Sequence, residues 1–506
     1  MLAKVVSGAN VGLDCVPVTV EVDIASQGLP SFTIVGLADR AVEEAKERVR
    51  AALRNCGANF PPKRITVNLA PADLPKEGPA FDLPIALGVL VASGQLESKL
   101  DETLVVGELS LDGGLRSTRG ILAFAMLAKG MGAKRIFVPK ENAAEAAVVD
   151  GVQVFSFGNL LEVFQFLTNA LEVKPEAPTG LWGREDQVFE YDFKDIKGQQ
   201  QAKRALEIAA AGGHNILMKG PPGAGKTLLA RSLASILPTL SKEEILEVTK
   251  IYSISGNMPA NRPFITIRPF RSPHHTASYV GIIGGGNIIK PGEVSLAHRG
   301  VLFLDELPEF PRMILEALRQ PMEDRQVTIS RSSGSLTFPS QFILLAAQNP
   351  CPCGFLGSPN KHCVCMPGQI ARYKKKVSGP LLDRIDIHLE VPAVELEKLT
   401  GEDDPEDSKT VREMVEKARQ IQIKRFYGEG ILTNAEMGSQ HIKRYCQITA
   451  EGLELLKLAI SQMNLSARGY HRALKLARTI ADLSESENIL PEYVAEALTY
   501  RAREES

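Results

Sequence analysis

The feature that most constrains how this 506-residue chain can fold is a glycine-rich loop at residues 220–227. Its members are Gly220, Pro221, Pro222, Gly223, Ala224, Gly225, Lys226 and Thr227. A short apolar run, residues 215–218, comes before the loop, and a helical pattern, residues 228–233, comes after it. Strand, loop and helix in this order, with the spacing G-x-x-x-x-G-K-T, predict a phosphate-binding loop.

Lys226 and Thr227 would carry the chemistry of this loop. The glycines let consecutive backbone N–H groups point at one anion, and the start of the following helix adds favourable potential. The Lys226 amine would reach the β- and γ-phosphates of a nucleoside triphosphate, and the Thr227 hydroxyl would coordinate Mg²⁺. A chance Gly/Pro turn before a helix is the alternative, and the complete motif with both flanks disfavours it.

A second apolar run, residues 301–304, ends in Asp305 and Glu306. A buried parallel strand places its carboxyl end where open α/β sheets bind their ligands. We expect Asp305 to hold the Mg²⁺ shell and Glu306 to polarise the attacking water. Alone this pattern is often just a strand end, but after a phosphate loop it predicts nucleotide hydrolysis.

The next apolar strand, residues 342–347, is soon followed by Asn349, whose amide would orient the attacking water. Further along, Arg384 is a candidate arginine finger, a planar cation that neutralises transition-state charge from across a subunit interface. The alternative for this arginine is a salt bridge to Asp383 or Asp386, since charged residues usually decorate surfaces.

The first part of the chain, residues 1–172, has the pattern of an α/β domain. Alternating valines predict a half-buried strand over residues 16–23, and Pro17 favours an edge position or a strand start. The other elements expected here are helices over 38–56, 83–92 and 120–129 and strands over 64–69, 103–109 and 135–138.

Two segments of this domain, residues 76–82 and 113–119, resemble the proteolytic domain of the Lon family. The resemblance implies a nucleophilic serine after Gly-Pro in the first segment and an activating lysine in the second. Ala80 stands at the serine position, and Arg116 and Arg119 occupy the lysine region. Without a hydroxyl there is no acyl-enzyme route, so we expect a Lon-like fold without protease activity. A scaffolding or nucleic-acid-contacting role and a purely structural one both stay open.

Taken together, the nucleotide-binding segments resemble an AAA+ ATPase of the magnesium-chelatase-like group and, within it, the ComM/YifB family. The segments that carry this resemblance are residues 209–215, 268–276, 368–373 and 381–387. The resemblance implies that Asn349 is the sensor-1 residue and Arg384 the finger. It also implies that Arg468 is the sensor-2 arginine, with Arg472 as its rival. The resemblance further implies a hexameric ring that acts on DNA and, for a ComM member, branch migration during uptake of transforming DNA.

The last part of the chain reads as an α-helical lid, because helical patterns with mostly short connections follow one another there. These patterns cover residues 409–425, 450–463, 467–483 and 491–503. Closure of such a lid would couple the γ-phosphate to domain rotation. The expected organisation is a Lon-like domain at 1–172, a linker at 173–190, an AAA+ core at 191–400 with a cysteine-rich insertion at 351–365, and the lid at 401–506.

Four of the seven cysteines form two C-x-C pairs with nine residues between them: Cys351, Cys353, Cys363 and Cys365. Four thiolates can close a tetrahedral Zn²⁺ site and so hold an irregular loop that lacks its own core. The C-x-C spacing is less specific than C-x₂-C, and free or redox-active thiols are the rival interpretation. His362 is a spare ligand.

Several further features are less specific. The glycine-rich segment at 281–287 permits close backbone approach or a mobile tip, and the family resemblance implies that it faces the central pore of the ring. A predicted hairpin at 327–338 carries Arg331 near its tip as a candidate phosphate contact. An ordinary surface loop is the alternative for both. A Gly-Gln turn at 198–199 points to the adenine side of the pocket, with a capped helix as the alternative. We interpret His274 and His275 as structural rather than as a metal pair.

Composition bounds the remaining possibilities. A net charge of −2 means that contact with nucleic acid depends on local basic patches, such as Arg372 and residues 374–376, for which a solvated face is the alternative. The chain opens without the pattern of an export signal and has no run of about 18 apolar residues. We therefore expect a cytoplasmic protein with reduced cysteines and no membrane partner.

The sequence thus predicts a Mg²⁺-dependent AAA+ ATPase motor of the ComM/YifB type that forms a homo-hexamer and acts on DNA. The runner-up is a chelatase-type or chaperone-like subunit that remodels a protein partner. A third interpretation, a regulatory module that binds ATP but turns over slowly, is disfavoured by Glu306. The missing Ser/Lys dyad disfavours an ATP-dependent protease.

Overall fold

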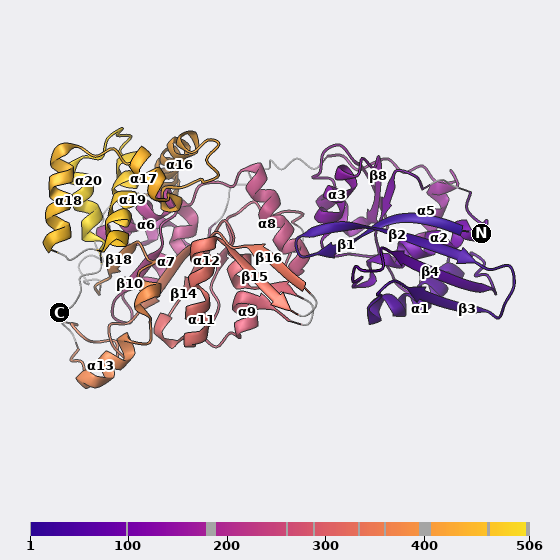
Figure 1. Ribbon diagram of the computed structural model, residues 1–506, viewed down its shortest axis with the longest axis horizontal. Helices are drawn as coiled ribbons and strands as arrows, with labels where there is room; N and C mark the ends of the chain where they lie inside the picture. Colours follow the sequence, from indigo (N-terminus) through magenta and orange to yellow (C-terminus); the bar gives the residue numbers. More distant parts are fainter. Residues whose placement is uncertain are drawn as a thin grey trace. The chain divides into compact units, whose positions relative to one another are not determined.

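The computed structural model describes residues 2–97, 100–178, 189–259, 262–286, 289–331, 334–358, 361–393, 406–462 and 466–501. Its contacts divide the chain into two compact units, coloured along the sequence in Figure 1. The N-terminal unit combines Met1–Arg184 with Lys242–Ile265. The second unit combines Glu185–Ser241 with Thr266–Ser506 and is named the ATPase unit after the predicted nucleotide-binding motifs that it contains. Most of the expected linker, residues 179–188, and the expected start of the lid, within 394–405, lie outside the described residues.

The N-terminal unit is built on a seven-stranded mixed sheet in the order β3-β4-β2-β1-β5-β8-β9. Its strands are β1 (Leu2–Val11), β2 (Asp14–Ile24), β3 (Ser31–Val35), β4 (Arg64–Ala70), β5 (Thr103–Val105), β8 (Arg135–Pro139) and β9 (Gln153–Phe157). Its main helices are α1 (Arg40–Asn55), α2 (Asp82–Ala92), α3 (Ile121–Gly130) and α5 (Leu160–Leu167). The sequence predicted β2, β4, β8, α1, α2 and α3, while the expected strand over 103–109 is divided into β5 and β6 (Glu108–Leu109).

The expectation that Pro17 marks an edge strand or a strand start is wrong, because β2 begins at Asp14 and lies inside the sheet between β4 and β1. The pairing with β4 begins only at Thr19, whereas the pairing with β1 includes Pro17 opposite Gly8. On the β4 side, Pro17 therefore lies beyond the paired stretch, and its missing N–H interrupts no ladder there.

A helix from the middle of the chain, α8 (Lys242–Ser255), belongs to the N-terminal unit rather than to the ATPase core. Lys250 Nζ lies 2.6 Å from Asp14 Oδ1, and the Ser253 hydroxyl donates to Glu145 Oε1 at 2.5 Å. Burial raises the pKa of Glu145, and the hydrogen bond from Ser253 opposes this rise. The sequence boundaries assigned this stretch to the core because they followed chain continuity, while the contacts group it with α3 and its neighbours.

The ATPase unit contains a five-stranded parallel sheet in the order β11-β14-β17-β10-β18. Its strands are β10 (Ile216–Lys219), β11 (Phe270–Arg271), β14 (Val301–Leu304), β17 (Ile343–Gln348) and β18 (Ile387–Glu390). β10 lies between β17 and β18, so the chain order reverses direction across it, and a ligand is expected at the carboxyl ends of the strands around such a point. The expected hairpin is β15 (Gln326–Arg331) and β16 (Gly334–Pro339), though nothing is described of the Arg331 side chain.

The lid packs on this core through α16 (Ser408–Arg425), which contacts α6 (Gln200–Gly212) and α7 (Lys226–Ile236). Its other helices are α17 (Ser439–Tyr445), α18 (Ala450–Gln462), α19 (Ala467–Leu483) and α20 (Pro491–Thr499). The sequence predicted all of these except the short α17, and the predicted ends at 463 and 502–503 lie outside the described residues. Core and lid share one buried apolar cluster, so they are a single unit by packing.

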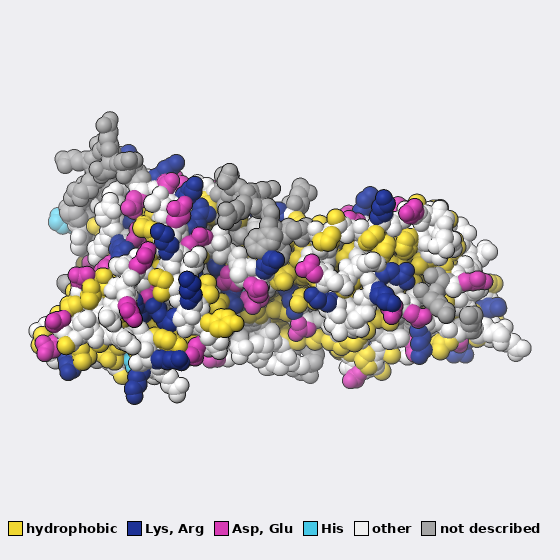
Figure 2. Space-filling view, turned by 90° about the horizontal axis from the view of Figure 1, so that it is seen from above, with side chains coloured by type: hydrophobic (Ala, Val, Ile, Leu, Met, Phe, Trp, Pro, Cys, Tyr) yellow, Lys and Arg dark blue, Asp and Glu magenta, His cyan; other side chains and the backbone are white. Residues whose placement is uncertain are grey.

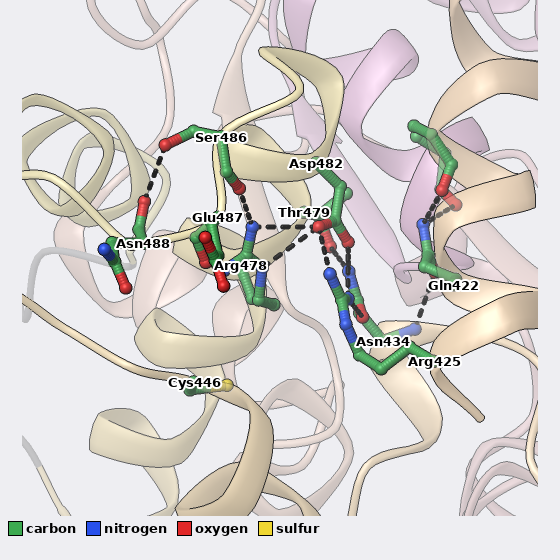
Figure 3. Close-up of polar contacts among 12 residues, drawn as sticks. Gln422, Arg425, Asn434, Cys446, Arg478, Thr479, Asp482, Ser486, Glu487 and Asn488 are labelled. Carbon is green, nitrogen blue, oxygen red and sulfur yellow. Dashed lines mark hydrogen bonds and ion pairs between the residues drawn. The ribbon is translucent and has the colours of Figure 1, made fainter.

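A buried polar network runs through the lid (Figure 3). Asp482, which is 1% exposed, accepts hydrogen bonds from Arg425, Arg478 and Asn434. The Asn434 amide also donates to the Thr479 hydroxyl at 3.1 Å. Because each buried charge has a partner of opposite sign, the network satisfies groups that would otherwise be costly to bury.

The surface carries charges of both signs. On the face seen in Figure 2, Lys and Arg side chains are interspersed with Asp and Glu side chains over the described part of the chain. None of the described helices is both long and apolar enough to cross a bilayer.

Candidate nucleotide-binding and hydrolysis site

The predicted phosphate loop joins the end of β10 to the start of α7. Gly220 has no room for a side chain, because a Cβ there would lie 2.1 Å from the backbone oxygen of Val391. Gly225, with φ +80°, precedes α7 in a left-handed conformation and offers no side-chain cap to its N-terminus. The first N–H groups of α7 are therefore available to an anion, and the helix dipole favours one.

Lys226 is the first residue of α7 and its amine lies over the loop. Nζ donates to the backbone oxygens of Gly220 and Pro221, both at 2.8 Å, and to Asn349 Oδ1 at 3.1 Å. Burial lowers the pKa of this amine, and the negative charges of Asp305 and, to a smaller extent, Glu306 oppose this change. The amine is thus held by three neutral acceptors, and a negatively charged phosphate group could replace them as its hydrogen-bond partner.

The two acidic residues lie at the carboxyl end of β14, as the sequence predicts. Asp305 Oδ2 accepts a hydrogen bond from the Thr227 hydroxyl at 3.0 Å, and Oδ1 accepts one from the Glu306 N–H at 2.9 Å. Glu306 adopts φ +51°, a left-handed conformation that is uncommon for a residue with a side chain. Such strain concentrates at functional sites, because the surrounding structure must maintain it.

This donor set fits Mg²⁺-ATP. Thr227 and Asp305 offer a hydroxyl and a carboxylate within 3.0 Å of each other, the oxygen ligands that Mg²⁺ takes alongside water and phosphate. Lys226 and the open N-terminus of α7 supply positive potential for the phosphates. The Asn349 amide, directly after β17, reaches the same place through its contact with Lys226.

Two side chains near the site have contacts that the sequence did not reveal. His275 Nδ1 lies 3.6 Å from Glu306 Oε2, so this histidine faces the predicted water-activating acid although we interpreted it as structural. The signal was its position just after β11, since β11 and β14 are neighbours. Gln199, the residue before α6, donates from its side chain to the backbone oxygen of Ala224 at 2.8 Å, which brings the predicted Gly-Gln turn to the loop.

Arg384, the predicted finger, is paired with an acid that the sequence did not reveal. The Arg384 guanidinium pairs with Glu323, not with Asp383 or Asp386, and donates to the backbone oxygen of Pro380 at 2.6 Å. Its hydrogen bond lowers the pKa of Glu323, and the positive charge of Arg468 adds to this effect.

Arg468 and its rival Arg472 lie on α19 in different environments. Arg468 is exposed in the first turn of the helix. Arg472 is half-buried, donates to the backbone oxygen of Ile385 at 3.2 Å and lies 3.7 Å from Asp386 Oδ1. Arg472 is thus tied to the segment beside Arg384, whereas Arg468 faces solvent.

The four clustered cysteines come together on the loop that follows β17. Their Sγ atoms all lie within 4.8 Å of one another, and the structure has all four as free thiols. Backbone N–H groups, first that of Phe355, lower the pKa of the Cys353 thiol to about 6. The arrangement could hold a metal ion.

In the N-terminal unit, residues 107–109 connect the two Lon-like segments. The Gly107 N–H donates to the backbone oxygen of Ala80 at 3.0 Å. The next residue, Glu108, lies opposite Arg116 in the antiparallel ladder between β6 and β7 (Leu115–Arg116). Ala80 itself carries no hydroxyl, and Arg116 and Arg119 are exposed.

A buried ion pair lies just beyond Ala80. Arg48 binds both oxygens of Asp82, at 2.6 and 3.0 Å, and the Leu109 N–H donates to the same carboxylate. Burial raises the pKa of Asp82 to about 6, and the hydrogen bond from Arg48 opposes the rise.

Family models describe most of the chain in consecutive pieces. "Magnesium chelatase, subunit ChlI" matches residues 192–399, "Subunit ChlI of Mg-chelatase" matches 20–142, and "Magnesium chelatase, subunit ChlI C-terminal" matches 405–501. The first covers the phosphate loop, the acidic pair and Arg384, and the last covers the helical lid.

Curated relatives extend over the whole chain. It is 46% identical to Competence protein ComM of Haemophilus influenzae over 99% of this chain and 97% of that protein. It is 45% identical, with the same coverage, to uncharacterized protein YifB of Escherichia coli. Lon protease 2 of Bacillus subtilis is 30% identical over 27% of this chain and 26% of its own length, which agrees with the Lon-like N-terminal segments. The chain belongs to the ComM/YifB family of magnesium-chelatase-like AAA+ ATPases.

Proposed function

We propose that this chain forms a homo-hexameric ring that hydrolyses Mg²⁺-ATP in the cytoplasm and uses the energy to migrate branched DNA during recombination or uptake of transforming DNA. The observation that carries the proposal is the meeting of Lys226, Thr227, Asp305 and Asn349 at one edge of the ATPase sheet. The DNA substrate is inferred from the full-length similarity to a competence protein.

Bound Mg²⁺-ATP supplies the γ-phosphoryl group that is transferred to water. Lys226 neutralises phosphate charge, and Thr227 and Asp305 hold the metal ion. Glu306 orients the attacking water and accepts its proton, while Asn349 fixes the position of that water through its amide. Positioning and charge neutralisation are the main demands of this reaction, and these side chains are of the types that meet them.

Arg384 completes the site of a neighbouring subunit. In the single chain its guanidinium is held by Glu323 and is only 12% exposed, so assembly must exchange this contact for a phosphate. Arg468 on the lid acts on the nucleotide of its own chain and moves with lid closure. Hydrolysis then depends on the ring, because each site needs an arginine from outside.

A local cluster of basic side chains, rather than the net charge of the protein, supports contact with DNA. Arg372 and Lys375, at the end of α13 (Pro367–Lys374), are both exposed, and phosphate contact is the typical use of such a basic run. With a net charge of −2 the protein has no overall attraction to DNA, so contact must be local and sensitive to salt.

The test is the ATPase rate of the full chain with no DNA, with single-stranded DNA, with duplex and with a four-way junction, over a salt series. Stimulation that is largest with the junction and fades with salt is expected, and a Glu306→Gln variant provides the blank. If no DNA changes the rate at any salt concentration, the DNA proposal fails and remodelling of a protein partner takes its place.

A further inference from the structure

The cysteine-rich loop has the geometry of a thiolate metal site. The Sγ atoms of Cys351 and Cys353 are 3.4 Å apart, and each lies 3.6 Å from Sγ of Cys363. In a tetrahedral site with Zn–S bonds of about 2.3 Å, neighbouring sulfurs are about 3.8 Å apart. The sulfurs are therefore already close to the edges of the tetrahedron that Zn²⁺ requires, and Cys365 supplies the fourth corner.

The loop has little else to hold it in place. Within its described residues, 351–358 and 361–366, Cys351 is the one buried side chain, and Val364 and Met366 are 82% and 72% exposed. A segment that buries so little apolar surface does not offset the entropy of ordering its backbone. Four metal–thiolate bonds can replace the missing core, as they do in small zinc-stabilised domains.

The same loop touches the phosphate loop. Gly354 lies so close to Pro222 that a Cβ at this glycine would be 2.6 Å from Pro222 Cδ. The N–H of Gly354 donates to the backbone oxygen of Cys351 at 2.9 Å, so this turn is formed by the cysteine segment itself. The position of the cysteines therefore determines what lies against the outer side of the phosphate loop.

A second connection runs along the chain. Cys351 comes two residues after Asn349, whose amide accepts a hydrogen bond from Lys226. Fixing Cys351 limits where Asn349 can point, and Gly354 limits where Pro222 can move. Both limits act on the groups that receive the phosphates.

We propose that Cys351, Cys353, Cys363 and Cys365 bind one Zn²⁺ per chain and that this zinc-bound loop braces the phosphate loop, so that nucleotide binding and turnover require the metal. The proposal goes beyond DNA-dependent motor activity, because the metal acts on the nucleotide site of every chain. Zinc binding deprotonates the thiols and releases their protons to solvent, with no change in oxidation state.

The metal content of the purified full chain is the first measurement. About one zinc per chain is expected, and Co²⁺ exchanged into the site should give the absorption of a tetrahedral thiolate complex. Cys353→Ser should lose the metal, while Cys15→Ser, in β2 of the N-terminal unit, should keep it. A chain that neither contains zinc nor binds added Zn²⁺ or Co²⁺ overturns the site.

Substitutions at two glycines of the loop test its contact with the phosphate loop without removing any metal ligand. Gly354 and Gly357 have similar backbone conformations, φ +83° and +76°, but a Cβ at Gly357 would meet nothing within 4 Å. Gly354→Ala should keep its zinc and lose ATP affinity and turnover by about tenfold or more, since small misplacements of catalytic groups cost that much. Gly357→Ala introduces the same backbone strain and should keep its zinc, its ATP affinity and its turnover.

Equal ATP binding and turnover by the two alanine variants would overturn the brace, as would full turnover by zinc-free protein. Zinc removed from the wild-type chain by a chelator, then restored, gives the reversible form of the test and does not depend on any variant folding. All readouts are taken without DNA, so a failure of the DNA proposal would leave them unchanged.

Discussion

Substitution of Asp482 tests whether its buried carboxylate stabilises the lid. Asp482→Asn keeps the size of the side chain and removes its charge, which leaves the guanidinium groups of Arg425 and Arg478 without a counter-charge (Figure 3). The Arg478 side chain is 1% exposed, so water cannot solvate the charge that loses its partner. Breaking one side of a buried pair costs about 3 to 5 kcal/mol.

The effect is measurable by denaturation in urea. With a slope of about 3 kcal/mol per molar, a loss of this size lowers the midpoint for the ATPase unit by about 1 M or more. The two units can unfold separately, so amide hydrogen exchange in α16 and α19 should accompany the optical signal. Glu454→Gln, an exposed acid on α18, is the control and should stay within about 0.5 kcal/mol of the wild type.

A midpoint for Asp482→Asn that matches the control would refute the reasoning, because it would mean that the two arginines find other partners at no cost. The expected exchange pattern is also specific. Amides of α19 should lose protection, while those of β1 and β2 in the N-terminal unit should not change.

Further predictions concern pH and the hydrolysis site. Burial lowers the pKa of His388 to about 4, so as the pH falls below about 6.5 the unfolded chain binds a proton before the folded chain does. The free energy of unfolding of the ATPase unit should therefore fall by at most about 3 kcal/mol between pH 6.5 and pH 4. In urea melts, His388→Gln should reduce this dependence of stability on pH. His275→Ala should reduce turnover several-fold with ATP affinity within about twofold of wild type by fluorescence titration, and a parallel loss of affinity would contradict a role in positioning Glu306. Arg384→Ala should abolish turnover and spare ATP binding, so unchanged turnover would remove the finger assignment. Glu306→Gln subunits mixed with wild type should inhibit more than in proportion to their fraction, and simple dilution would argue against a coupled ring.

Local patterns predicted a large part of the fold. The strands of the ATPase sheet that carry motifs, β10, β14 and β17, follow from short apolar runs bounded by polar residues, and four of the lid helices follow from their periodicity. Short strands such as β11 have too few residues to show a period. The position of β2 inside its sheet was missed because the prediction rested on one proline, and a local pattern does not show which strands pair.

Contacts between distant residues explain the rest of what the sequence did not reveal. His275 and Glu306 meet because β11 and β14 are neighbours in the sheet, and nothing in the spacing of the two residues specifies that order. Similarly, Arg384 could be matched from sequence only with nearby acids, whereas its partner Glu323 lies 61 positions away. Motifs identify the residue types that a reaction needs, but sheet order decides which side chains complete the site.

The placement of α8 shows the same limit at the scale of domains. Residues 237–241 join the end of α7 to the start of α8, and α7 begins with Lys226 and Thr227. One end of this short stretch therefore belongs to the helix of the phosphate loop, and the other belongs to a helix that packs within the N-terminal unit. A boundary drawn along the sequence cannot detect this arrangement, because α8 has an ordinary helical composition and only its contacts with α3 assign it. The Lon-like unit is thus built partly from a segment that the ATPase motifs enclose, and the two parts of the chain cannot be separated by a single cut.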